Sequence, residues 1–212
     1  MIIIDVGAAN SNLKKKSGKV YVMFEPDSDA FRDLQLRHAG DPSVYIFEDG
    51  LWREEGTIDL YLTRKRECSS VYKPNISLIE SLRDSHHNQD IGRFNIDKEL
   101  KIDVVRLDSA LDKVVDDLIA KGHPKDSITV DKIKIDTQGS EFDILQGMGK
   151  YIDLVEEIEV EVEFVELYLG QKLFSDIDSF LTSKGFVLDG WVRKVKFSGI
   201  DVFGDAVYKR RS

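Results

Sequence analysis

The sequence opens with Met1-Ile2-Ile3-Ile4-Asp5-Val6-Gly7-Ala8-Ala9, and this stretch decides the fold. Its three isoleucines form an unbroken β-branched run, which is typical of a strand buried on both faces of a parallel sheet. The run stops at Asp5, and the small residues Gly7 and Ala8 follow, so backbone N–H groups of the turn can approach a ligand closely. We therefore expect a parallel α/β sheet whose first strand ends at a ligand-binding turn.

A second apolar run, Val20–Phe24, is followed by Glu25 and Pro26. An acidic residue at the tip of the second strand is positioned to accept hydrogen bonds from the two hydroxyls of a ribose. Strand, small-residue turn, strand and acid together indicate a site for a nucleotide-type cofactor. The alternative is a purely structural turn, because the same pattern also occurs in sheets that bind nothing.

Length and composition indicate one globular domain without a basic surface. The 212 residues fit a single domain over 1–212, with 42% hydrophobic and 33% charged residues. The net charge of −9 disfavours binding to nucleic acid or to an anionic membrane, because both need a basic face. No apolar run reaches the roughly 20 residues of a membrane span. The chain begins directly in a predicted core strand, so we expect no secretory signal.

Cysteine and histidine give no sign of a disulfide framework or a zinc site. The single cysteine, Cys68, favours a reducing compartment, so we expect a cytoplasmic protein. The histidines lack zinc-site spacing and are expected to be surface or hydrogen-bonded residues: His38, His86, His87 and His123. We predict no metal site, with a divalent cation held mainly by carboxylates as the open alternative.

Apolar periodicity places the remaining elements, and the segment 64–100 interrupts them. Helices are expected over 28–38, 108–122, 142–148 and 174–184, and strands over 44–47, 57–63, 101–107, 132–136, 155–164, 186–192 and 205–209. The strand over 57–63 is expected to form a hairpin with the chain before it, and the last two strands to add an antiparallel strand. Segment 64–100 lacks periodicity and is either a lid or substrate loop or a solvated insertion.

Three acidic or apolar residues follow the third strand: Glu48, Asp49 and Leu51. The two acids are placed to accept hydrogen bonds from the exocyclic amine of a purine, and Leu51 is placed to pack against the purine ring. A polar turn beside an ordinary core residue explains the same pattern equally well.

A second stretch with candidate functional residues runs from Lys132 to Glu141. The strand within this stretch ends at Asp136. In open α/β sheets, ligands bind beyond the carboxyl ends of the central strands. We therefore expect Asp136 beside the same crevice as Asp5. Glu141 is placed either for catalysis or as an ordinary helix-start acid.

The strand over 155–164 carries four glutamates on one face, Glu157, Glu159, Glu161 and Glu163. Four carboxylates on one face are costly unless they are paired or hydrated, and we expect Lys132 and Lys134 on the neighbouring strand to pair with some of them. The glutamates nearest the carboxyl end, Glu161 or Glu163, are then expected to reach the crevice, where a raised pKa suits a general base.

Three motifs occur in the order found in one known family: Asp5-Val-Gly-Ala8, Phe24-Glu-Pro26 and Lys134-Ile-Asp-Thr-Gln-Gly-Ser-Glu141. Together with Cys68-Ser-Ser70, Leu107-Asp108, Glu161 and Tyr168-Leu-Gly-Gln171, they resemble the FkbM family of S-adenosylmethionine-dependent methyltransferases over nearly the whole chain. The resemblance implies a class I methyltransferase fold, a Rossmann-like, doubly wound sheet of seven strands, mostly parallel, with one antiparallel strand from the C-terminal hairpin. It also implies O-methylation of a hydroxyl.

The resemblance assigns roles by position. Asp5, Gly7 and Ala8 would line the methionine end of the cofactor, Glu25 with Pro26 the ribose, and Glu48, Asp49 and Leu51 the adenine. Asp136 would lie near the sulfonium and the acceptor hydroxyl, which makes Asp136 and Glu161 the candidate catalytic residues. The chain departs from the family pattern at two positions. Ser11 stands near the position of the glycine that usually closes the first turn, and Gln138 stands where many members have Glu. Because the side chain of Gln138 is an amide, this residue is a poor candidate for a base.

We therefore predict an S-adenosylmethionine-dependent O-methyltransferase acting on a sugar, glycan or polyketide-like hydroxyl, with a homo-oligomer as a possible assembly. Two alternatives stay open. A nicotinamide-dependent oxidoreductase is disfavoured by the absence of a G-x-G-x-x-G motif. A catalytically idle cofactor-binding domain gains some support from Gln138.

Overall fold

The computed structural model describes residues 1–9, 11, 15–82, 91–197 and 199–211. His86 and His87 lie outside the described residues. Among the described residues, no helix has the length and apolar character needed to cross a bilayer.

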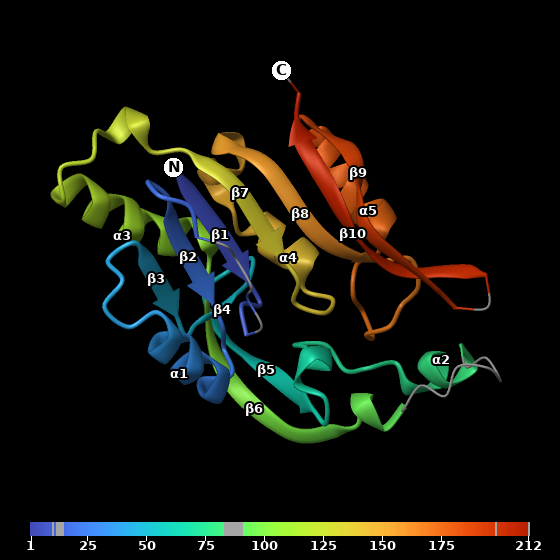
Figure 1. Cartoon of the computed structure of the whole chain (residues 1–212). Helices are drawn as coiled ribbons and strands as arrows, with labels where there is room; N and C mark the ends of the chain where they lie inside the picture. Colours follow the sequence, from blue (N-terminus) through green and yellow to red (C-terminus); the bar gives the residue numbers. More distant parts are fainter. Residues whose placement is uncertain (10, 12–14, 83–90, 198, 212) are drawn as a thin grey trace. The chain divides into compact units, whose positions relative to one another are not determined.

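Seven strands form one sheet in the order β3-β2-β1-β7-β8-β10-β9. Strand β1 pairs in parallel with β2 on one side and with β7 on the other, whereas β9 and β10 form an antiparallel hairpin (Figure 1). This arrangement confirms the predicted fold class. The strands are β1 (Ile2–Val6), β2 (Val20–Phe24), β3 (Val44–Phe47), β7 (Val130–Ile135), β8 (Val155–Glu163), β9 (Phe186–Phe197) and β10 (Ile200–Arg210).

A second sheet has three strands in the order β4-β6-β5. These strands are β4 (Gly50–Leu51), β5 (Gly56–Thr63) and β6 (Ile96–Val105), and the α-helices are α1 (Ser28–Arg37), α2 (Ile76–Ser81), α3 (Leu107–Ala120), α4 (Glu141–Gln146) and α5 (Phe174–Ser183). Short 3-10 turns cover Arg66–Cys68, Ile91–Phe94, Lys125–Ser127 and Gly149–Leu154.

The described chain divides into two compact units. The first comprises Met1–Gly56, Asp103–Ile135 and Asp143–Glu159, and the second comprises Thr57–Ile102, Asp136–Phe142 and Val160–Ser212. The expectation of a single domain over 1–212 stays a prediction.

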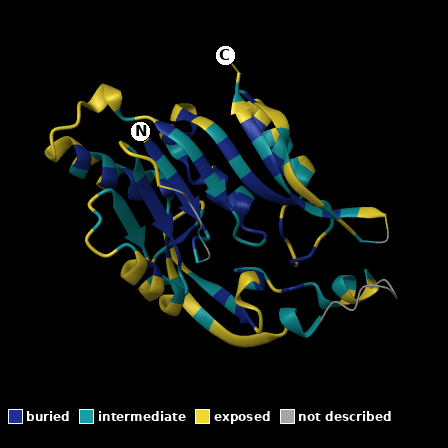
Figure 2. Ribbon diagram, in the orientation of Figure 1, coloured by how far each residue is buried: buried dark blue, intermediate teal, exposed yellow. Residues whose placement is uncertain are grey.

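The core of the first unit follows from its apolar runs. Every residue of β2 except Val20 is buried, and Ile2 and Ile4 of β1 are fully buried, as expected for strands covered on both faces (Figure 2). Helix α1 begins where Asp27 accepts a hydrogen bond from the Asp29 N–H at 3.0 Å, which satisfies one of the free donors of the first turn. Leu34 is its buried residue.

Strand β8 pairs its glutamates with lysine as predicted. Lys132 Nζ on β7 lies 2.6 Å from Glu159 and 3.0 Å from Glu157. Burial by itself lowers the pKa of Lys132, but the hydrogen bonds to Glu159 and Glu157 together raise that pKa above its ordinary value. The pairs therefore offset the repulsion between neighbouring carboxylates on one face of the strand.

In the second unit, two predictions differ from the structure. Strand β5 lies next to β6 and does not form a hairpin with β4, which precedes it. Strand β6 starts at Ile96, so part of the segment 64–100 is ordered strand, and α2 is a short helix within it. The first residues of β6 are exposed, and many of their side chains are charged. The sequence therefore lacks the alternation of apolar and polar residues that would have predicted a strand there. The role of this segment as a lid or substrate loop stays a prediction.

The ion pairs of Lys132 generate a first prediction. Replacing Lys132 with methionine removes the cation that pairs with both Glu157 and Glu159, which should lower the free energy of unfolding by about 1–2 kcal/mol. Urea titration followed by circular dichroism measures this change. The matched control is Lys101→Met, which removes an exposed pair with Asp59 and should cost clearly less. An equal loss in both variants would contradict a stabilising role of the β7–β8 pairs.

Candidate functional site

In the first unit, the turn after β1 is tied to the end of β2. Gly7 has a φ of 79°, which favours glycine. The N–H groups of Gly7 and Ala8 both donate to the Phe24 carbonyl oxygen, at 3.2 and 3.1 Å. The Ala9 N–H donates to Glu25 Oε2 at 2.9 Å. The small-residue turn is therefore held against the tip of the second strand.

Glu25 lies in the centre of this arrangement with only 6% of its surface exposed. Its second carboxylate oxygen, Oε1, accepts from the Asp27 N–H at 3.0 Å. Burial raises the pKa of Glu25 and the charges of Asp27 and Asp5 add to this, while the hydrogen bonds from Asp27 and Ala9 oppose it. The structure thus brings together Asp5, which is 3% exposed, Gly7, Ala8 and Glu25, and Pro26 follows Glu25 in the chain.

The three residues expected near adenine differ in exposure. Glu48 is exposed, Asp49 is half-buried, and Leu51 is buried in β4, where it pairs with Val105 of β6. Their roles at a purine stay predictions.

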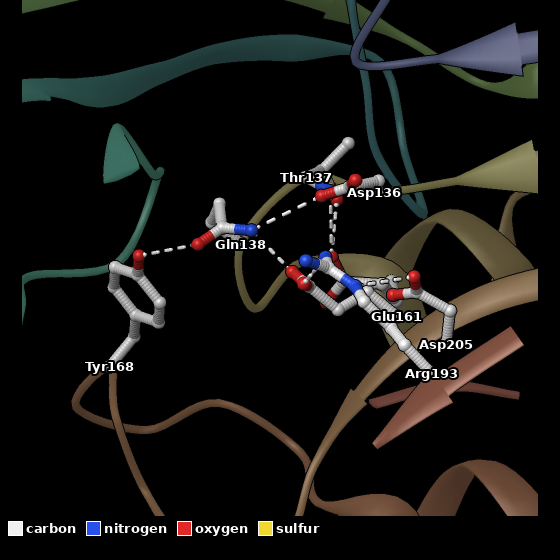
Figure 3. A network of polar contacts seen from close by, with 8 residues as sticks. Asp136, Thr137, Gln138, Glu161, Tyr168, Arg193 and Asp205 are labelled. Atoms are coloured by element: carbon white, nitrogen blue, oxygen red, sulfur yellow. Dashed lines mark hydrogen bonds and ion pairs between the residues drawn. The ribbon is translucent and has the colours of Figure 1, made fainter. Parts of the chain in front are cut away.

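In the second unit, the side chain of Gln138 connects Asp136, Glu161 and Tyr168 (Figure 3). Gln138 Nε2 donates to Asp136 Oδ1 at 3.1 Å and to Glu161 Oε2. Gln138 Oε1 accepts from the Tyr168 hydroxyl at 2.9 Å. The amide therefore holds both predicted catalytic carboxyl groups at one point.

The backbone of Gln138 has a φ of 59°, an uncommon conformation for a residue with a side chain. Ser70 Oγ donates to the Gln138 carbonyl oxygen at 2.6 Å, and Gly139 next to it has a φ of 110°. Strained backbone of this kind persists where surrounding contacts hold it, which is common at functional sites. Sequence reasoning considered Gln138 only as a poor base and missed its role as a bridge.

Arg193 on β9 completes the network. Its Nη2 lies 3.1 Å from Glu161 Oε1, and its Nε donates to Asp205 Oδ2 at 2.6 Å. Arg193 and Asp205 were not predicted as site residues from the sequence, since neither stands in a recognisable motif. Tyr168 was quoted in a motif but was not assigned to the site.

Burial raises the pKa of three glutamates in this unit. Glu161 is 3% exposed, and its pKa is raised well above the ordinary value by burial and by the charges of Asp136 and Glu163. Glu163 is 1% exposed, and burial with the charges of Glu141 and Asp136 raises its pKa as well. Carboxyl groups with a raised pKa are candidates for proton transfer.

Glu141 has a different role from Glu161 and Glu163, because its carboxylate stabilises the turn before α4. Glu141 Oε1 accepts from the Thr137 N–H at 2.8 Å, and Oε2 accepts from the Gly139 N–H at 2.8 Å. Burial raises its pKa to about 7. These contacts favour the structural one of its two predicted roles.

The described residues contain no group of three or more histidine, cysteine, aspartate or glutamate side chains that could hold a metal ion. Asp136 and Glu161 instead have the Gln138 amide as their shared partner.

The buried carboxyl of Glu163 generates a pH-dependent prediction. Its folded-state pKa is raised, so wild-type stability falls as pH rises through this pKa, and Glu163→Gln escapes that loss. The melting temperature of Glu163→Gln relative to wild type should therefore be higher at about pH 8 than at about pH 5. Glu156→Gln, an exposed glutamate on the same strand, is the control and should show no such trend. A difference that does not change with pH would contradict the raised pKa.

Comparison with known proteins places the chain in a family. A family model described as the methyltransferase FkbM domain matches residues 5–188. No curated protein matches the sequence.

Two solved structures show how the fold compares. The chain is similar to the methyltransferase FkbM from Methylobacillus flagellatus KT, with 15% identity and a TM-score of 0.52, over 98% of this chain and 42% of that protein. It thus spans less than half the length of that relative. It also resembles a magnesium protoporphyrin IX methyltransferase from Synechocystis PCC 6803, solved with bound SAM, at 8% identity and a TM-score of 0.47, over 99% of this chain and 69% of that protein.

The FkbM structure shares the fold of this chain, and the family model extends from β1 into β9. The chain therefore belongs to the FkbM methyltransferase domain family.

Proposed function

We propose that this protein is an S-adenosylmethionine-dependent O-methyltransferase that acts on a hydroxyl of a sugar, glycan or polyketide-like small molecule. Family membership supports the methyltransferase assignment. The observation that carries the proposal is the buried Glu25 carboxylate, held beside the small-residue turn by two backbone N–H groups. Cytoplasmic location and a homo-oligomeric state remain parts of the same proposal.

The first unit fits the cofactor. Glu25 uses each carboxylate oxygen for one backbone contact, and each oxygen keeps a further lone pair with which to accept from a ribose hydroxyl. In this proposal Pro26 lies beside Glu25 at the ribose of the cofactor. The methionine end of the cofactor contacts Asp5, Gly7 and Ala8. The adenine contacts Glu48, Asp49 and Leu51. When bound, S-adenosylmethionine supplies an electrophilic methyl group on its sulfonium sulfur.

The second unit supplies the groups that handle the acceptor proton. Asp136 or Glu161 would accept the proton of the acceptor hydroxyl, and the bound cofactor would supply the methyl group that this oxygen takes up. Gln138 positions both carboxyl groups through its amide N–H bonds. The chemistry asked of the protein is therefore orientation, exclusion of water and proton removal.

Cofactor binding is tested by thermal shift with S-adenosylhomocysteine, the demethylated product. At a hundredfold excess over its Kd, a ligand adds about 2.7 kcal/mol to stability, which corresponds to about 5–10 °C for a chain of this length. Glu25→Ala should abolish the shift, because the ribose loses its acceptor.

The melting temperature of ligand-free Glu25→Ala is measured separately, since this variant also loses two backbone contacts. Asp33→Ala, which changes an exposed carboxylate of α1 in the same unit, should keep the full shift. A wild-type protein that shows no shift at millimolar ligand would refute cofactor binding, and a shift with NAD(P) instead would favour the oxidoreductase.

The catalytic carboxyl groups are tested by activity. With a panel of sugars, glycans and polyketide-like alcohols as acceptors, Asp136→Asn and Glu161→Gln should each lower the rate of S-adenosylhomocysteine release by about 100-fold or more. Glu161→Gln should still bind S-adenosylhomocysteine. Asp201→Asn, at a paired aspartate outside the network, is the control. Unchanged rates in both variants would remove these residues from the mechanism, and cofactor binding without any transfer would favour the idle-domain alternative.

A further inference from the structure

The second unit contains a cavity of about 300 Å³, a volume at the lower end of the range for small-molecule sites. The carboxyl groups of Asp136, Glu161 and Glu163 line it, and so do apolar side chains and three cations. Of these cations, Arg193 is paired with Glu161 and Asp205, and the other two are Lys65 and Arg93. Three chemically different surfaces thus belong to one cavity, and each restricts what can bind there.

Glu163 marks the acidic surface as a binding surface. It is 1% exposed, and a hydrogen bond with the Gln171 side chain lowers its pKa in part, but its Oε2 atom has no hydrogen-bond partner among the described residues. A buried polar atom without a partner is costly, so a ligand that supplies the missing hydrogen bond gains from it. A hydroxyl group suits this position, since it can donate as well as accept.

The second surface of the cavity is apolar. Leu167 belongs to a buried cluster against which Leu82, Phe94 and Phe203 pack, and all four side chains line the cavity. A sugar would leave most of its hydroxyls facing these side chains without hydrogen-bond partners, which is unfavourable. An apolar body of a ligand would instead be removed from water here.

The third surface carries Lys65 and Arg93, neither of which pairs with a carboxylate among the described residues. Arg93 is held in place, because its Nε donates to Cys68 Sγ at 3.2 Å and its guanidinium lies 5.3 Å from the centre of the Phe94 ring. Glu67 also lines the cavity, so two cations stand against one anion here. This balance favours an anionic group of the ligand.

A chain of polar contacts separates the cationic surface from the acidic one. Cys68 contacts Arg93 through its sulfur, and its carbonyl oxygen lies 3.2 Å from the Tyr168 hydroxyl. Tyr168 in turn donates to Gln138, whose amide holds Asp136. Arg93 and the carboxyl groups therefore stand at opposite ends of this chain, with apolar side chains lining the same cavity.

We propose that this cavity binds the methyl acceptor, and that the acceptor is an amphipathic hydroxy acid: its hydroxyl meets Glu163 beside Asp136 and Glu161, its apolar body lies on Phe94, Leu167 and Phe203, and its anionic group pairs with Lys65 and Arg93. The role as acceptor rests on the proposed function, and it narrows the acceptor classes named there to the polyketide-like alcohols. Glu163 is then a specificity-determining residue that contacts the hydroxyl.

Isothermal titration calorimetry on the full chain, with and without S-adenosylhomocysteine, tests this proposal with three probes. The compound ω-hydroxyoctanoate carries all three features, octanediol lacks the anion, and glucuronate lacks the apolar body. We expect ω-hydroxyoctanoate to bind about tenfold more tightly than octanediol, as for one charge-assisted contact, and glucuronate to bind most weakly.

Variants assign the anionic contact. The double variant Lys65→Gln/Arg93→Gln should bind ω-hydroxyoctanoate and octanediol equally, whereas Lys172→Gln/Arg211→Gln, which removes the same charge from exposed positions outside the cavity, should keep the tenfold preference. Glu163→Ala should weaken both hydroxyl probes while leaving octanoate, which has no hydroxyl, unaffected.

The proposal is overturned if glucuronate binds as tightly as ω-hydroxyoctanoate, if the two variants behave alike, or if no probe binds in either condition. Probe binding in a protein that fails to bind S-adenosylhomocysteine would uphold the cavity and refute the proposed function alone.

Discussion

The amide of Gln138 allows two carboxyl groups, those of half-buried Asp136 and buried Glu161, to lie together in the second unit. Asp136 and Glu161 would repel each other if both were charged, and burial makes that repulsion stronger. A neutral NH₂ group can donate to both at once, and Arg193 adds a positive charge on the far oxygen of Glu161. The strained backbone at Gln138 is the structural cost of placing the amide there.

Two buried glutamates illustrate how partners decide the role of a carboxyl group. Glu25 receives a backbone N–H on each oxygen, so it is oriented and stabilises its own turn. Glu163 is buried even more completely but keeps one oxygen without a partner among the described residues. The first group is therefore preorganised, whereas the second gains a hydrogen bond when a ligand arrives.

Local pattern was sufficient for the central strands and most helices. The apolar runs of β2 and β3 were predicted with their observed bounds, and α1 and α5 were predicted to within one residue, because burial and helix caps leave local signals. Strand β6 was predicted to begin five residues too late, and β5 was given the wrong partner. Exposed, charged strands leave no apolar alternation, and strand pairing depends on residues far apart in the chain.

The sequence by itself determined the parallel sheet, the family, and the acidic residues at the strand ends, because these depend on short runs and motifs. It also indicated that Lys132 would pair with the glutamates of β8. Only the tertiary structure decided that Gln138 joins Asp136 to Glu161 and Tyr168. It also decided that Arg93 and Lys65 line one cavity with Asp136, Gln138 and Glu161. These contacts join residues from different strands and loops, and such distances are set by chain folding, which no local pattern encodes.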